Sequence, residues 1–136
     1  MLSIVDTSPL YAAADANDRH HDACVSALRR PDLQLVVPVF VVAEAAYLVA
    51  ERLGPRAEAA FLRGMAKMEV ESPSVDDWER MAALVEQYRD FPLGAADASV
   101  VALAERLGTD CVITLDRRHF GAVRPRHVPA FHLLPE

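Results

Sequence analysis

Two kinds of hydrophobic segment alternate along this chain, and each has its own spacing. Short apolar runs predict strands, and longer runs with apolar positions three or four residues apart predict helices. The strands are expected at residues 2–6, 33–37, 68–71, 111–115 and, as an edge strand among prolines, 131–134. One helix is expected to start at Pro9, and further helices are expected to cover residues 19–30, 38–53, 55–62, 74–88 and 95–107. This alternation favours a mostly parallel sheet with helices on both faces.

Residues with known capping preferences mark several of these boundaries. Thr7 and Ser8 precede Pro9, so either hydroxyl is expected to cap a helix that starts there. Gly54 is a natural stop for the helix before it, and Ser74 a natural start for the one after it. Residues 117–121 are expected to form a turn.

A single domain is expected over residues 1–136, because the length and the 52% hydrophobic share suit one core. Cys24 and Cys111 lie in apolar segments without disulfide-like spacing, so both are interpreted as reduced, buried thiols. The first residues lack the features of a secretion signal. The longest apolar stretch, residues 36–50, is short and contains Pro38 and Glu44. We therefore expect a cytoplasmic protein that does not associate with a membrane.

Charge is unevenly distributed along the chain. The formal net charge of -6 argues at first sight against a nucleic-acid partner. From residue 117 onward, however, four arginines stand against one acid, which leaves this last stretch net positive. Such a stretch is also typical of an ordinary solvated surface, so charge alone does not decide the function.

Four carboxylates stand out by their positions. Asp6 ends the first strand and Asp116 follows the strand at residues 111–115, so both fall on the edge where α/β sheets bind ligands. Glu44 and Asp97 are isolated charges inside apolar helices. A carboxylate there needs a cation or a paired partner, because burying it alone costs several kcal/mol. Each acid taken singly also fits a solvated helix edge or a distant arginine partner; the four together favour a shared site.

The donor set indicates which metal such a site would prefer. Oxygen ligands without a histidine or cysteine cluster favour Mg²⁺ or Mn²⁺ over zinc or copper. Thr7, Ser8 and Thr114 lie within two positions of Asp6 or Asp116, where a hydroxyl can bond a carboxylate, a metal-bound water or a phosphate. For Thr7 and Ser8, helix capping is an equally good interpretation. The adjacent His20 and His21 do not face one another on a helix, and they are set aside.

Four motifs in a fixed order resemble PIN-domain proteins, and most closely the VapC-type toxins of bacterial toxin–antitoxin pairs. The motifs are IVDTSP at 4–9, PVFVVAE at 38–44, LGAADA at 93–98 and ITLDRRHF at 113–120. The resemblance covers the whole chain, and the order of the motifs is its specific part. Asp6, Glu44, Asp97 and Asp116 match the acidic positions of that family.

The resemblance implies a three-layer α/β/α sandwich and an endoribonuclease that depends on Mg²⁺ or Mn²⁺. It also implies a homodimer and inhibition by a small VapB-like antitoxin. Ser8 and Thr114 match its accessory polar positions. The apolar residues Phe61, Leu62 and Trp78 are expected to be exposed and available for protein contacts.

The expected chemistry is hydrolysis of an RNA phosphodiester by a metal-activated water. Asp6 and Asp97 are expected to be direct ligands, with Glu44 as a ligand or water-orienting base and Asp116 as a ligand acting through water. Arg117 and Arg118 are expected to hold phosphates beside the scissile one.

Other classes of protein fit the chain less well. A phosphotransfer receiver domain needs a late lysine near its acids, but the only lysine is Lys67. A haloacid-dehalogenase-like phosphatase needs an aspartate two positions after Asp6, where Ser8 stands. A PIN-fold RNA-maturation nuclease and a non-catalytic interaction module remain alternatives, and a neighbouring antitoxin gene would favour the toxin.

Overall fold

A five-stranded, entirely parallel sheet forms the centre of the computed structural model, which describes residues 1–136. The strands lie in the order β3-β2-β1-β4-β5. Their bounds are β1 Leu2–Val5, β2 Gln34–Pro38, β3 Glu69–Glu71, β4 Cys111–Ile113 and β5 His132–Leu134. All five predicted strands are present, and the mostly parallel α/β class is confirmed.

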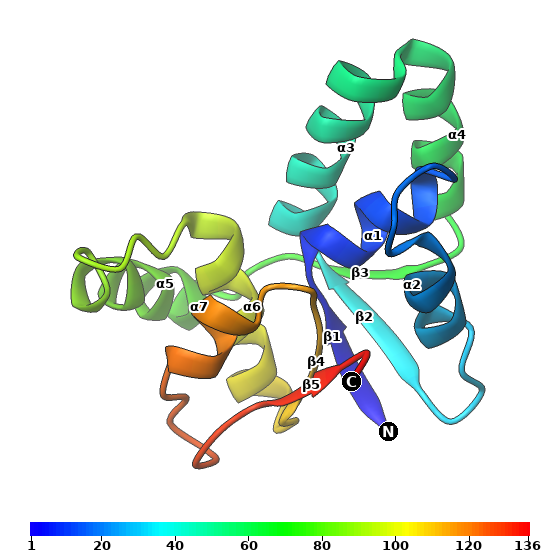
Figure 1. Ribbon diagram of the computed structural model, residues 1–136. Helices are drawn as coiled ribbons and strands as arrows, with labels where there is room; N and C mark the ends of the chain where they lie inside the picture. Colours follow the sequence, from blue (N-terminus) through cyan, green and yellow to red (C-terminus); the bar gives the residue numbers. More distant parts are fainter.

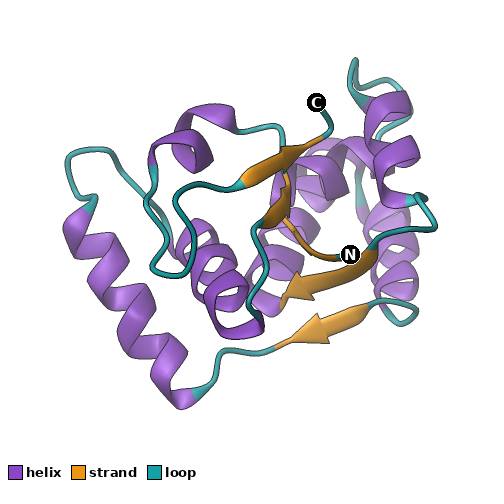
Figure 2. Cartoon of the chain, turned by 90° about the horizontal axis from the view of Figure 1, so that it is seen from below, coloured by secondary structure: helices purple, strands orange, loops and turns teal.

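Seven helices connect and cover the strands. They are α1 Thr7–Ala14, α2 His21–Leu28, α3 Val39–Leu53, α4 Pro55–Met65, α5 Val75–Gln87, α6 Ala95–Leu107 and α7 Arg117–Ala122. Figure 1 shows α1, α2 and α4 on one side of the sheet and α5, α6 and α7 on the other. Figure 2, turned by 90°, shows helices on either side of the strands again. The three-layer sandwich is therefore confirmed.

Local sequence explains most helix boundaries. Gly54, at φ 91°, ends α3 in a conformation that side-chain-bearing residues rarely adopt. Ser74 and Asp77 form a reciprocal capping box at the start of α5: the Ser74 hydroxyl accepts from the Asp77 amide, and the Asp77 carboxylate accepts from the Ser74 amide. The predicted role of Ser74 is confirmed.

Two local predictions about helix boundaries are wrong. Residues 117–121 belong to helix α7 instead of a turn, because the Asp116 carboxylate caps it by accepting from the His119 amide at 3.0 Å. Neither Thr7 nor Ser8 caps α1; its N-cap is Asp6, which makes no side-chain capping bond. The Ser8 hydroxyl instead accepts from the Leu115 amide across the sheet.

One apolar core of 26 buried residues lies between the sheet and the helices. Helix α6 is almost wholly buried, because it packs against α5 and α3 as well as against the central strands β1, β2 and β4. Cys24 and Cys111 are buried and free, as predicted. Phe61 belongs to this core, so the expectation that it is exposed is wrong. None of the seven helices has the length and hydrophobicity that a membrane span requires.

The central strand β1 is where the strand order reverses. Strands β2 and β3 extend the sheet on one side of β1, and the later strands β4 and β5 extend it on the other side. Asp6 follows the last residue of β1, and Asp116 follows β4, its neighbour. Such a switch point, at the carboxyl ends of the strands, is where open α/β sheets bind ligands.

Candidate active site

All four predicted acids line a single open cleft at this edge of the sheet. The cleft has a volume of about 350 Å³, and its walls include Asp6, Glu44, Asp97 and Asp116. Each acid comes from a different segment: the end of β1, helix α3, the first turn of α6 and the loop after β4. Residues separated by up to 110 positions thus share one site, as the order of motifs predicted.

Asp6 lies at the base of the cleft and is 4% exposed. Its carboxylate accepts a hydrogen bond of 2.7 Å from the Thr114 hydroxyl. Burial raises the pKa of Asp6 to about 7, although the Thr114 hydrogen bond and the Thr7 amide oppose that shift. Nearby Asp97 and Glu44 raise the pKa further by repulsion. A cation would relieve both the desolvation and the repulsion.

Thr114 links two of the acids. While its hydroxyl donates to Asp6, the same oxygen accepts from the Asp116 amide at 2.9 Å. The Ser8 hydroxyl holds the intervening Leu115 amide at 3.0 Å. Both predicted accessory residues therefore position the loop after β4 against the end of β1. Thr7, in contrast, has a buried hydroxyl with no hydrogen-bond partner.

Asp97 and Glu44 face the cleft from two helices. Asp97 is half-buried, and its pKa is raised, first by burial and then by repulsion from Asp116 and Glu44. Glu44 is exposed to solvent, so its position in an apolar helix does not bury it. The apolar residues around it in the sequence belong to the other faces of α3, where Val41, Ala45 and Val49 are buried.

The Asp116 carboxylate is hydrogen-bonded to His119 through both of its oxygens. One carboxylate oxygen caps α7, and the other lies 2.8 Å from the Nδ1 atom of His119. These bonds fix the carboxylate at the rim of the cleft and engage both of its oxygens. Asp116 is thus less free to bind a cation directly than Asp6 or Asp97.

The four acids suit a hydrated Mg²⁺ or Mn²⁺ better than a tightly caged ion. Their donors are all hard oxygens, and no histidine or cysteine lines the cleft. No three metal-binding side chains lie close enough together to form a ready coordination cluster. Mg²⁺ keeps several water ligands and binds through one or two carboxylates, so an open arrangement of this kind fits it.

The cleft also contains residues that the sequence analysis missed. Tyr11, Asp18 and Arg52 line it, and none of them stands at a strand end or alone in an apolar helix. Arg52, eight residues after Glu44, has the spacing that places both on one face of α3, which is the signal that was available. Arg117 and Arg118 are exposed and lie outside the cleft lining; Arg117 donates to the Pro135 carbonyl, and Arg118 lies over the Phe91 ring.

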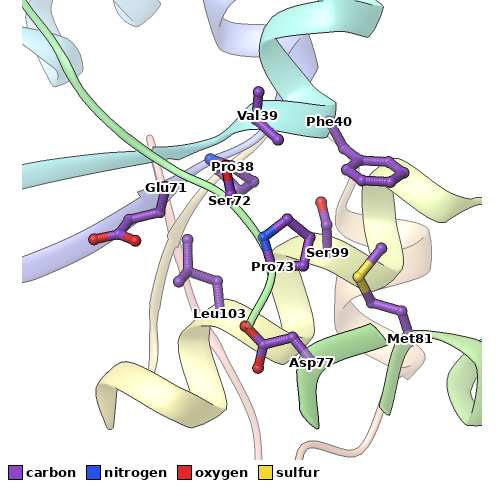
Figure 3. A pocket seen from close by; sticks show the side chains of 10 residues that line it. All are labelled: Pro38, Val39, Phe40, Glu71, Ser72, Pro73, Asp77, Met81, Ser99 and Leu103. Atoms are coloured by element: carbon purple, nitrogen blue, oxygen red, sulfur yellow. The ribbon is translucent and has the colours of Figure 1, made fainter. Parts of the chain in front are cut away.

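A second hollow, drawn in Figure 3, is too small to be a substrate site. Its free volume of about 10 Å³ holds roughly one water molecule. Its one buried carboxylate, Asp77, already accepts from Ser74 and from Arg106. This hollow shares no residue with the cleft of the four acids.

Comparison with known proteins gives the family. The family model for the PIN domain matches residues 3–124, so this chain belongs to the PIN-domain family. It is 42% identical to ribonuclease VapC26 of Mycobacterium tuberculosis over 134 residues, which is 97% of this chain and 99% of that relative. The resemblance to VapC-type proteins is therefore confirmed along almost the whole chain.

Solved structures share the fold. The Mycobacterium tuberculosis toxin VapC20, described as cleaving the sarcin-ricin loop, matches with a TM-score of 0.80 at 21% identity, covering 96% of this chain and 99% of that one. A toxin–antitoxin complex from Klebsiella pneumoniae matches with a TM-score of 0.67 at 19% identity, with the same coverage. At these identities the likeness concerns the fold alone.

Proposed function

We propose that this chain is a divalent-metal-dependent endoribonuclease and the toxin of a toxin–antitoxin pair. The observation that carries the proposal is the convergence of four carboxylates from four segments on one cleft, where none has an arginine or lysine partner. The 42% identity to a VapC ribonuclease supports RNA as the substrate.

Each of the four acids is assigned a role in the proposed hydrolysis. Asp6 and Asp97 would hold the cation, Glu44 would hold it or orient the attacking water, and Asp116 would act through a water. A bound Mg²⁺ or Mn²⁺ would supply activation of that water and stabilisation of charge on the phosphate. Thr114 keeps the Asp6 carboxylate aimed into the cleft through its 2.7 Å hydrogen bond. Glu44 is exposed at the cleft wall, where it can contact a water molecule in the cleft.

Total RNA is the best substrate for a first test, because the target sequence is unknown and total RNA contains many candidate sequences. The purified chain is incubated with total RNA plus Mg²⁺, Mn²⁺ or EDTA, and the new RNA ends are sequenced. The proposal predicts metal-dependent cuts at a small number of sites, and Asp97→Asn should abolish them. Cleavage that persists in EDTA, or in Asp97→Asn, would refute the assigned site.

Arg117 and Arg118 are proposed to hold RNA outside the cleft. Both are exposed and follow Asp116 directly. Each lost phosphate contact should lower the slope of log affinity against log salt by roughly 0.7 for a single strand. An unchanged slope in the Arg117→Ala, Arg118→Ala double variant, measured in an Asp6→Asn background to prevent cleavage, would remove both residues from the RNA path.

A homodimer and a small VapB-like antitoxin are proposed as protein partners. Leu62 and Trp78 are 49% and 54% exposed, which leaves apolar surface for such contacts. The structural relative from Klebsiella pneumoniae is a toxin–antitoxin complex, which supports a partner of this kind. Light scattering that shows a strict monomer, together with no small protein co-purifying from the native host, would refute this part.

A further inference from the structure

The cleft of the four acids contains one basic side chain, Arg52. A fifth acid, Asp18, also lines the cleft, so the cleft lining contains five carboxylates and a single guanidinium. An acidic cleft repels the RNA backbone, and a metal ion offsets that repulsion only near the scissile phosphate. A cation elsewhere in the same cleft is placed where it can attract the continuing strand.

Arg52 is held in place by an aromatic ring instead of an acid. Its guanidinium carbon lies 4.9 Å from the centroid of the Tyr11 ring, a cation–π arrangement. The Tyr11 hydroxyl in turn donates to Asp15 at 2.7 Å, which fixes the ring. Stacking constrains a guanidinium but leaves its N–H donors free for a ligand.

Other arginines of this protein show what a structural role looks like. Arg80 and Arg106 are ion-paired with acids at 2.7 and 2.8 Å, whereas Arg52, like most exposed arginines of the chain, takes part in no ion pair. A charge in the last turn of α3 also suits the helix dipole, but that effect does not require the side chain to stack on α1. Arg52 therefore differs from the other exposed arginines in being both stacked on a ring and part of the cleft lining.

The position of Arg52 indicates that a bound RNA strand would run along α3. Glu44, Leu48 and Arg52 all line the cleft and are spaced four residues apart, so they form one stripe along α3. At 1.5 Å per residue, Arg52 is about 12 Å along the helix from Glu44. It is thus placed to bind a different phosphate from the one beside the four acids.

We propose that Arg52 binds a backbone phosphate of the RNA next to the cleaved position and directs the strand along α3. This inference rests on the proposed ribonuclease function, and it adds a substrate-binding residue that the sequence did not indicate. The planar guanidinium suits two-point binding of phosphate oxygens, which makes the contact independent of base sequence.

Fluorescence anisotropy with a labelled single-stranded RNA of random sequence tests the proposal. The parent is the full chain carrying Glu44→Gln, in Mg²⁺, which removes the proposed water-orienting acid and keeps Asp6 and Asp97 for the metal, and the variants add Arg52→Gln, Arg52→Lys or Arg56→Gln. Arg56 is the matched control, because it is exposed on α4 and lies outside the cleft lining. Thermal unfolding of each variant checks that the fold is unchanged.

Arg52→Gln should weaken binding about tenfold and lower the salt slope by roughly 0.7. Arg52→Lys should keep the slope while losing part of the affinity, and Arg56→Gln should match the parent. Binding by Arg52→Gln that equals the Arg56→Gln control, or a parent that binds no RNA at low salt, overturns the assignment. RNA binding that depends on Arg52 while the unmodified chain cleaves no total RNA would instead refute the proposed function and keep the Arg52 contact.

Discussion

Two regions of this molecule contain clusters of charged residues. In one region the carboxylates are ion-paired with arginines, and in the other they have no arginine or lysine partner. Between α5 and α6, Glu105 receives both guanidinium bonds of Arg80, and Asp77 is bound by Arg106. These bonds outweigh partial burial, so the pKa of Glu105 is lowered. In the cleft, burial without a basic partner raises the pKa of Asp6 and of Asp97.

We interpret this contrast as the difference between acids that stabilise the fold and acids that are proposed to bind a metal ion. A paired carboxylate is stabilised in its charged form by the protein itself. An unpaired, buried one costs stability unless a cation arrives, and clusters of strongly shifted groups in a cleft are typical of functional sites. Removing a charge should therefore have opposite consequences in the two regions.

Asp6→Asn should give the largest effect, a loss of activity without a loss of stability. Loss of a direct ligand is expected to reduce metal-dependent RNA cleavage by about 100-fold or more, since loss of a residue that only supports a ligand already costs 10- to 100-fold. Thermal stability without metal should hold or rise, because the repelled carboxylate is gone. Near-normal turnover by this variant, measured with a mapped RNA substrate, would contradict the site.

The second prediction is that Asp6 makes the free energy of unfolding depend on pH. Its pKa is raised from 3.8 to about 7, so the unfolded chain ionises this carboxyl first, and the free energy of unfolding falls as pH rises between those values. The contribution amounts to roughly 4 kcal/mol. Urea unfolding of the metal-free chain at pH 4 and pH 8 should show this loss, and Asp6→Asn should lack it. Equal pH profiles for the two proteins would exclude an ionisable, buried Asp6.

Arg80→Ala should have the opposite effect to Asp6→Asn: it should lower stability and leave activity unchanged. The side chains of Arg80 and Glu105 are both 11% exposed, so removing the arginine leaves a nearly buried charge unpaired. We expect the free energy of unfolding to fall by about 3 kcal/mol. The rate of RNA cleavage per folded molecule should stay the same. A cleavage rate that falls while stability is retained would show that the two regions are not separate.

Thr114→Val should have the smallest effect. It removes the hydrogen bond to Asp6 and the acceptor for the Asp116 amide without a large change in volume. The pKa of Asp6 should rise further, and Mn²⁺ affinity should fall about tenfold. The matched control is Thr109→Val, whose hydroxyl donates to the Leu2 carbonyl at the other end of β1. Equal Mn²⁺ affinity in both variants would show that Thr114 has no special role.

Periodicity and motif order predicted all five strands and the four acids, because each depends on local spacing. The hydroxyl of Ser8 was misjudged, because its partner is the Leu115 amide, 107 residues away. Phe61 was misjudged for a similar reason: which helix face is buried depends on the neighbours that fold against it. Arg52 was missed although its spacing from Glu44 on one helix face was available in the sequence; its stacking over Tyr11 depends on the tertiary structure.

Titration of Mn²⁺ into the metal-free chain, followed by calorimetry, tests the central claim most directly. The account predicts saturable binding that is lost in Asp6→Asn and in Asp97→Asn. Glu71→Gln, which alters a carboxylate paired with Arg106 outside the cleft, should bind Mn²⁺ like the unmodified chain. Binding that survives both cleft variants, or that is lost equally in Glu71→Gln, would contradict the claim that the unpaired acids form the metal site.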